Sequence, residues 1–461
     1  MSARSCRAIT LVLAAPFAAS LAAQAPTTAA AAAAGLALRS IGPALMSGRI
    51  ADVAVHPTDK SLWYVAAGSG GVWKTTNAGV TFTPVFDDQP SYSIGEITID
   101  PTRPDIVWVG TGENVSGRHV GWGDGVYRSR DAGRTWQRMG LPNSQHIGRI
   151  LVDPRDGDVV LVAAEGPLWS PGGDRGVFRT TDGGATWTPA LQIDENTGVT
   201  DIEFDPSDPD VVYAAGYQRR RHVWGFLGGG PSSGIWKSTD NGRTWRKVTN
   251  GLPAGDKGKI GLAVTAADPS LVYATIEAGE SERGFYRSRD RGESWEKRNG
   301  YISGGTGPHY YQELEASPTD PNRVYQMDVF IQVTRDGGKT FDYLETGHDK
   351  HSDNHALWID PADGRHMLVG TDAGLYESFD EGARWRHFPN LPVSQFYKVA
   401  LNNREPFYDL LGGAQDEGTL HGPSRTLNRD GIRNADWYVP LGADGYGVAF
   451  DPRDPDLMYL M

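Results

Sequence analysis

Four carboxylates of this chain lie in glycine-rich segments that follow short apolar runs, and they are its clearest candidates for catalysis. They are Glu113, Asp372, Asp416 and Asp444. Cleavage of a glycosidic bond uses two carboxyl groups, one as an acid and one as a base or nucleophile. If the protein is a glycoside hydrolase, these four residues are the candidates for its two carboxyl groups.

A second group of residues is suited to binding rather than to bond cleavage. Long segments between apolar runs are rich in Trp, Arg and His, and we expect these to contact a ligand: Arg118, His119, Trp122, Trp169, Arg220, His222 and Trp224. Long structured loops on a rigid scaffold commonly carry binding sites, and aromatic faces suit sugar rings or apolar peptide side chains. The alternative is that these aromatic side chains fold back and pack their own loops.

A third group could bind a metal. In the segment 348–355, an extended backbone would turn His351, Asp353 and His355 to the same side. Two imidazoles and a carboxylate can hold a divalent transition metal. The alternative is a polar loop whose groups bond one another and the backbone. No organic cofactor is expected.

A repeated octapeptide shows what positions these residues. The pattern S/T-x-D/N-x-G-x-T-W/F occurs seven times, and its third positions are Asn77, Asp131, Asp182, Asp240, Asp290, Asp336 and Asp380. The interval between successive copies ranges from 44 residues (Asp336 to Asp380) to 58 residues (Asp182 to Asp240). Each copy lies in a unit with four short segments rich in Val, Ile, Tyr and Trp, separated by Gly, Pro and Asp. This period predicts an all-β propeller of four-stranded blades, at least seven of them complete.

The octapeptide itself has a structural explanation. Its hydroxyl and carboxylate can accept backbone N–H groups in the turn between the third and fourth strands, and its Gly can adopt a positive φ. Its Trp or Phe then packs between neighbouring blades. In the last copy Arg384 replaces the Thr, so we expect a looser turn there. We interpret the repeated carboxylates as structural and not catalytic.

The N-terminus has the pattern of a secretory signal. Arg4 and Arg7 precede the apolar run 9–21, and small residues follow it, so we assign residues 1–25 to a signal peptide. The single cysteine, Cys6, would leave with this peptide, and disulfides are not expected in the mature chain. We therefore expect a secreted or periplasmic protein with no membrane insertion after signal removal. The net charge of −13 argues against a nucleic-acid partner.

The blade pattern sets the remaining boundaries. An Ala-rich linker covers 26–38, and blades 1–7 with their octapeptides cover 39–395. Residues 396–461 contain further blade strands without the octapeptide, and the last unit stops within a strand. An unclosed propeller would expose sheet edges. We therefore expect the array to be incomplete in this chain and to continue in the natural protein.

The octapeptide resembles the Asp box, or bacterial neuraminidase repeat. In families with this repeat the box lies on the edge of the blade away from the site, which implies a functional face opposite to it. A sialidase would have an R-I-P strand motif, but the segment 47–51 reads Ser-Gly-Arg-Ile-Ala. The first blade, 41–79, resembles that of xyloglucanase-type endoglucanases, whose base would stand where this chain has Gly68.

The broadest resemblance is to secreted bacterial Asp-box proteins of the sortilin N-terminal type. It is carried by the runs SGGVWKTTNAG, VGTGE, GLPAGDKGKIG, HSDNHALWIDP and GGAQDEGT. The resemblance implies extracellular binding of a peptide or protein, or of a polysaccharide, on the channel face. The alternative that it implies is a xyloglucanase-like glycoside hydrolase acting through the channel-face carboxylates.

Overall fold

The computed structural model describes residues 39–461 except 46, 305–306, 312 and 346–348. The signal peptide and nearly all of the Ala-rich linker expected from the sequence lie outside these residues. Residues 41–461 form one compact unit. No helix in the described part is both long and apolar enough to cross a membrane.

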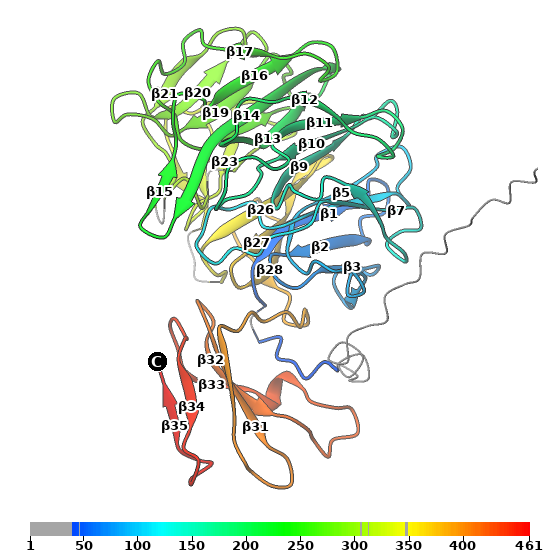
Figure 1. Cartoon of the computed structure of the whole chain (residues 1–461), viewed down its shortest axis with the longest axis vertical. Helices are drawn as coiled ribbons and strands as arrows, with labels where there is room; N and C mark the ends of the chain where they lie inside the picture. Colours follow the sequence, from blue (N-terminus) through cyan, green and yellow to red (C-terminus); the bar gives the residue numbers. More distant parts are fainter. Residues whose placement is uncertain (1–38, 46, 305–306, 312, 346–348) are drawn as a thin grey trace, which may run out of the picture. The chain divides into compact units, whose positions relative to one another are not determined.

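Seven four-stranded antiparallel sheets follow one another along the chain, as the repeat predicts (Figure 1). Their first strands are β1 (Ile50–Val55), β5 (Ile94–Ile99), β9 (Ile147–Val152), β13 (Thr197–Asp205), β18 (Ile260–Val264), β22 (Leu314–Ala316) and β26 (Asn354–Asp360). Their second strands are β2 (Trp63–Ala67), β6 (Val107–Thr111), β10 (Val160–Ala164), β14 (Asp208–His222), β19 (Val272–Ile276), β23 (Val324–Gln326) and β27 (Asp363–Thr371). The second strands β2, β6, β10 and β19 are buried at every residue, because sheets cover both of their faces.

The outer strands of each blade flank the Asp-box turn. The third strands are β3 (Val72–Thr75), β7 (Val126–Ser129), β11 (Gly176–Thr180), β16 (Gly234–Ser238), β20 (Gly284–Ser288), β24 (Gln332–Thr334) and β28 (Gly374–Ser378). The fourth strands are β4 (Thr83–Pro84), β8 (Gln137–Gly140), β12 (Thr188–Leu191), β17 (Arg246–Val248), β21 (Glu296–Asn299), β25 (Asp342–Tyr343) and β29 (Arg386–His387). In the fourth blade β14 extends past the sheet and forms a hairpin with β15 (Gly225–Gly228) (Figure 1).

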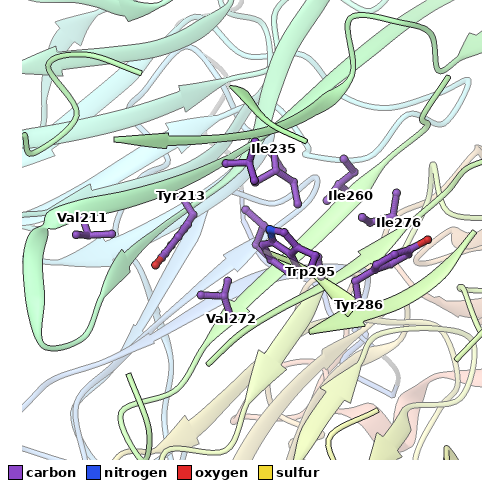
Figure 2. Packing of buried hydrophobic residues seen from close by; sticks show 12 residues of the cluster. Val211, Tyr213, Ile235, Ile260, Val272, Ile276, Tyr286 and Trp295 are labelled. Atoms are coloured by element: carbon purple, nitrogen blue, oxygen red, sulfur yellow. The ribbon is translucent and has the colours of Figure 1, made fainter. Parts of the chain in front are cut away.

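The hydrophobic core is divided into clusters that lie between neighbouring blades. Figure 2 shows one of them, in which Trp295 and Tyr286 of the fifth blade meet Ile235 and Tyr213 of the fourth. Another cluster joins Trp63 of the first blade to Phe388 at the end of the seventh, with ring centroids 5.6 Å apart. Since β1 packs against both β5 and β26, the seven blades close into a ring.

Further sheets follow these seven blades. An eighth four-stranded sheet contains β30 (Lys398–Leu401), β31 (Asp409–Ala414), β32 (Gly418–Pro423) and β33 (Tyr438–Leu441), with the short 3-10 helix η1 (Asn434–Asp436) before its last strand. The strands β34 (Val448–Phe450) and β35 (Met458–Leu460) form a two-stranded sheet, and β34 packs against β30 and β31. The ring of seven closes without these sheets. Continuation of the array beyond residue 461 stays a prediction.

The Asp-box turns have the bonds that the sequence predicts. In the second blade the Ser129 hydroxyl accepts the N–H of Gly133 at 2.8 Å, and Asp131 accepts both the N–H and the hydroxyl of Thr135 at 2.8 and 2.7 Å. Burial is the largest single influence and raises the pKa of Asp131, but these bonds together outweigh it and hold that pKa at about 2. Trp136 donates from its indole to the carbonyl of Val85 in the first blade. The box therefore fastens one blade to the next.

The seventh box corrects one expectation. The turn at Arg384 was expected to be looser because the Thr is missing. Instead, the Arg384 backbone N–H donates to one carboxyl oxygen of Asp380 and its Nε donates to the other, both at 2.9 Å. The guanidinium thus takes the place of the absent hydroxyl, and the turn keeps both contacts.

Candidate functional site

A cavity of about 400 Å³ opens on the face of the ring opposite the Asp-box turns. Its walls come from loops that join second to third strands and from segments that lead into first strands. The side chains that matter here are those of Arg49, Glu113, Arg118, His119, Tyr310, Asp353, Asp372, Tyr397, Asp416 and Glu417. The cavity therefore unites three of the four carboxylates singled out from the sequence with two of the expected ligand-binding residues.

Arg49 organises one side of this cavity. It stands just before β1, and its Nε donates to Oδ1 of Asp372 at 2.5 Å while Nη2 donates to Oδ2 at 3.2 Å. Oε1 of Glu113 lies 3.6 Å from Nη1, and Nη2 also donates to the Tyr310 hydroxyl. Burial alone would lower the pKa of Arg49, but Asp372 and Glu113 outweigh it and raise that pKa well above its usual value.

Asp372 is ionised because Arg49 and His355 both stabilise its carboxylate. Its Oδ1 lies 2.8 Å from Nε2 of His355 in addition to its contact with Arg49. Burial favours the neutral carboxyl, yet Arg49 and then His355 outweigh burial and hold the pKa of Asp372 far below its usual range. Asp372 therefore stays a carboxylate across the physiological pH range and can accept hydrogen bonds from a ligand.

Glu113 is more deeply buried and more weakly paired. Its Oε2 accepts the N–H of Gly121 at 3.3 Å, whereas Oε1 has no hydrogen-bond partner in the described part of the chain. Burial is the largest influence and raises the pKa of this carboxyl despite Arg49. A Cβ at Gly68 would collide with Oε1 of Glu113. The Glu113 carboxyl thus fills the space beside the residue at which the xyloglucanase resemblance expects a base.

The turn between β31 and β32 supplies two more carboxyls. Burial, reinforced by Asp372 and Asp353, raises the pKa of the half-buried Asp416 to about 6. Burial and the neighbouring Asp416 raise the pKa of Glu417 to about 9. Asp444 does not line the cavity, but it is exposed and accepts the N–H of Asp416 at 3.3 Å. Sequence patterns gave Glu417 no weight beside Asp416, because its burial depends on tertiary packing.

The three tryptophans expected to contact a ligand are exposed and are not buried within their own loops. Trp122, Trp169 and Trp224 are 70%, 48% and 85% exposed. Trp224 lies beyond the end of β14, where its ring stacks on His222 at a centroid distance of 4.7 Å. None of the three lines the cavity, whereas Arg118 and His119 do. These tryptophans are therefore exposed on their loops, and His222 covers one face of the Trp224 ring.

The three arginines of β14 each have a partner within the protein, and ligand contact by Arg220 stays a prediction. Arg220 donates to the side chain of Asn196 at 2.9 Å. Its neighbours Arg219 and Arg221 are buried: Arg219 pairs with Glu165 at 2.6 Å, and Nε of Arg221 donates to the carbonyls of Ser116 and Gly117. The fourth blade thereby fixes loops of the second and third blades. Strand alternation, which turns 219 and 221 to one side and 220 to the other, was the available signal.

The possible metal ligands do not converge. Asp353 has a φ of +64°, so the backbone before β26 is not extended and the expected alternation fails. Asp353 accepts hydrogen bonds from Tyr311 and Ser352, His355 pairs with Asp372, and Nδ1 of His351 lies 2.9 Å from the Ser352 carbonyl. Within the described ranges, no three His, Cys, Asp or Glu residues are placed to hold a metal ion.

Sequence reasoning also missed Arg49 and Tyr310 as cavity residues. Arg49 was considered only against a sialidase motif, and Tyr310 not at all. Both lie in segments that lead into a first strand, whereas the expected ligand-binding residues all came from loops between second and third strands. Segments leading into first strands end on the same face, which is the signal that could have found them.

Fold and repeats define the class of this protein as an Asp-box β-propeller. Residues 124–254 match the family model described as "Sortilin, neurotensin receptor 3". A xyloglucanase from Hypocrea jecorina is 23% identical over 365 residues, which cover 71% of this chain and 41% of that protein. A xyloglucanase from Paenibacillus is 28% identical over 262 residues, covering 50% of this chain and 24% of that protein.

Solved structures show the same fold. The GH74 xyloglucanase from Xanthomonas campestris aligns with a TM-score of 0.63 at 19% identity, over 89% of this chain and 63% of that one. The GH74 enzyme of Niastella koreensis aligns with a TM-score of 0.60 at 16% identity, over 89% of this chain and 64% of that one. The chain thus spans less than half the length of the curated xyloglucanases and less than two thirds of these structures. It is similar to sortilin in one part and distantly related to the xyloglucanases.

Proposed function

We propose that this protein binds a polysaccharide in the cavity opposite the Asp-box turns. The observation that carries the proposal is the composition of that cavity, in which the aromatic rings of Tyr310 and Tyr397 lie beside hydrogen-bonding groups such as Arg118, His119 and Asp372. Sugar-binding sites need both, because a sugar ring has apolar faces for stacking and hydroxyls that require hydrogen-bond partners. The names of the distant relatives, xyloglucanases, support a polysaccharide as the ligand class.

The setting of this function follows from the N-terminal sequence. We propose that the protein acts outside the cytoplasm, as a secreted or periplasmic protein, because residues 1–25 have the pattern of a signal peptide. A polysaccharide of a cell wall or matrix lies outside the cytoplasm, so the proposed location agrees with the proposed ligand. A mature N-terminus close to residue 25, read from the protein recovered from culture medium or periplasm, is the expected result.

A second candidate function is hydrolysis of the bound glycan. The specific observation in its favour is that two carboxyls lining the same cavity have pKa values shifted in opposite directions. Arg49 and His355 keep Asp372 ionised, while burial raises the pKa of Asp416 to about 6. Below about pH 6, Asp372 is ionised and Asp416 is protonated, which are the states that a base and an acid need. In this candidate Asp372 is the base, Asp416 is the acid, and Glu113 and Asp444 lie next to them.

The experiment that tests both candidates uses the intact protein. Binding is measured on arrays of glycans and of peptides, and release of reducing sugar is measured from every glycan that binds. We expect glycan binding that falls in Arg118→Ala and His119→Ala proteins of unchanged melting temperature. Peptide binding without any glycan binding overturns the proposal in favour of a sortilin-like peptide receptor. Sugar release that disappears in Asp372→Asn and Asp416→Asn establishes the hydrolase.

A further inference from the structure

Three acidic residues at the end of the eighth sheet form a group that we call the acidic corner: Asp416, Glu417 and Asp444. Glu417 lines the cavity, is 2% exposed, and has no hydrogen-bond partner for either carboxyl oxygen among the described residues. The Asp416 backbone N–H donates to Asp444 at 3.3 Å, which keeps the two residues together. Burial of an unpaired carboxyl is costly, so such a group in a cavity wall indicates a missing partner.

The missing partner is positively charged. The groups that act most strongly on Glu417 are the carboxylates of Asp416 and Asp372, and both are of its own sign. On Asp416 the strongest influences are three further carboxylates and one imidazole, that of His351. Arg49 at the cavity wall is already engaged by Asp372 and Glu113, and the Lys398 ammonium lies 5.3 Å from the centroid of the Tyr446 ring. Neither carboxyl oxygen of Glu417 has a hydrogen-bond partner among the described residues, so its partner has to come from a ligand.

The geometry of the corner suits an organic cation rather than a metal ion. Within the part of the chain that the structure describes, no three acidic or imidazole groups converge to form a metal site. Two tyrosine rings stand beside the corner: Tyr397 and Tyr446 have centroids 5.3 Å apart and are 40% and 47% exposed. Exposed aromatic faces stack on sugar rings and attract cations.

We propose that the acidic corner recognises the ammonium group of an amino sugar, so that the polysaccharide bound in the cavity contains glucosamine-type units. The sugar ring stacks on Tyr397, which lines the cavity, and its ammonium group pairs with Glu417. This inference rests on the proposed polysaccharide binding and names the ligand class. It does not require turnover of the ligand.

The test compares two oligosaccharides that differ only in charge. A short β-1,4-linked glucosamine oligosaccharide and its N-acetylated form are titrated into the intact protein by calorimetry at mildly acidic pH, with a neutral xyloglucan oligosaccharide as reference. We expect the glucosamine form to bind at least about tenfold more tightly than the N-acetylated form. Because a cation beside Glu417 lowers its raised pKa, binding must also release protons, which appears as a dependence of the heat on the buffer.

Two variants decide whether the acidic corner is responsible. Glu417→Gln removes the charge, keeps the shape and should fold at least as stably, because it replaces an unpaired buried carboxyl. We expect it to abolish both the preference and the proton release. The matched control is Glu280→Gln, an exposed carboxyl that does not line the cavity, and it should keep both.

The other outcomes are distinct. Equal binding of the charged and neutral oligosaccharides overturns the assignment of the amino sugar but leaves polysaccharide binding intact. A preference for glucosamine that survives Glu417→Gln shows that the net charge of the chain is responsible and overturns the acidic corner. Binding of none of the three oligosaccharides overturns the proposed function and this inference together.

Discussion

Nε of Arg49 donates a hydrogen bond to Oδ1 of Asp372 over 2.5 Å and so joins the start of the first blade to the loop after β27 in the seventh. These residues are 323 positions apart in the chain. The same guanidinium lies 3.6 Å from Glu113 of the second blade. One side chain therefore contributes to ring closure and also fixes two carboxyls of the cavity.

Arg49 should be needed for both stability and binding. Arg49→Leu leaves the buried carboxyls of Asp372 and Glu113 without their cation, and a buried pair broken in this way typically costs about 3–5 kcal/mol. Urea denaturation measures the loss. The double variant Arg49→Leu with Asp372→Asn should recover part of it, since the unpaired charge is gone. Equal stability of the two variants would contradict a charge-based explanation.

The hydroxyl of the Asp box should contribute measurably to the free energy of unfolding. Ser129→Ala leaves the buried N–H of Gly133 without an acceptor, and we expect a loss of about 1–3 kcal/mol in the free energy of unfolding. Arg384→Thr restores the usual box residue in the seventh blade. It should change stability by less than about 0.5 kcal/mol, because the guanidinium already makes the contact of the hydroxyl. A large gain in Arg384→Thr would show that the native turn is strained.

Two buried glutamates of the central channel, Glu203 and Glu315, should make the protein less stable as the pH rises from 4.5 to about 8. Burial raises the pKa of Glu203 to about 8 and that of Glu315 to about 7, in both cases despite Arg149, which lies 3.0 Å from Glu203. The unfolded value is 4.5, so the folded state binds more protons between that pH and about 8. The free energy of unfolding therefore decreases as the pH rises through this window.

Melting temperatures measured across that range check this expectation. The double variant Glu203→Gln with Glu315→Gln should show a shallower decline than the native protein, because its amides do not titrate. Glu280→Gln serves as the control and should leave the slope unchanged. An identical slope in the double variant would exclude Glu203 and Glu315 as the source, and Glu96, Glu165 and Glu417, whose pKa values are also raised, would be the next groups to test.

The stacked pair of Trp224 and His222 should contribute to glycan binding without contributing to stability. Trp224 is 85% exposed, so Trp224→Ala should leave the melting temperature unchanged. We expect it to weaken glycan binding by about tenfold, or about 1.4 kcal/mol. Phe379→Ala is a suitable control, because Phe379 is 62% exposed and belongs to the Asp-box turn on the opposite face. Equal effects of both variants would point to a general loss of apolar surface.

Much of the fold could be predicted because the repeat is local. Each box places Ser or Thr, Asp and Gly within one turn, so the bonds of Ser129 and Asp131 follow from eight consecutive residues. The failures occurred where a side chain has distant partners. The alternation expected for His351, Asp353 and His355 failed because Asp353 adopts a positive φ and bonds Tyr311, which precedes it by 42 residues.

The sequence by itself determined the blade, the number of boxed repeats and the face opposite to them, because these depend on contacts within a few dozen residues. Tertiary structure alone decided that seven blades close, that Arg49 is shared between Asp372 and Glu113, and that Glu417 is buried with no hydrogen-bond partner for its carboxyl among the described residues. The physical reason is that charge pairing and burial depend on which blades become neighbours across the ring. Such neighbours lie hundreds of residues apart in the chain, so no local pattern records them.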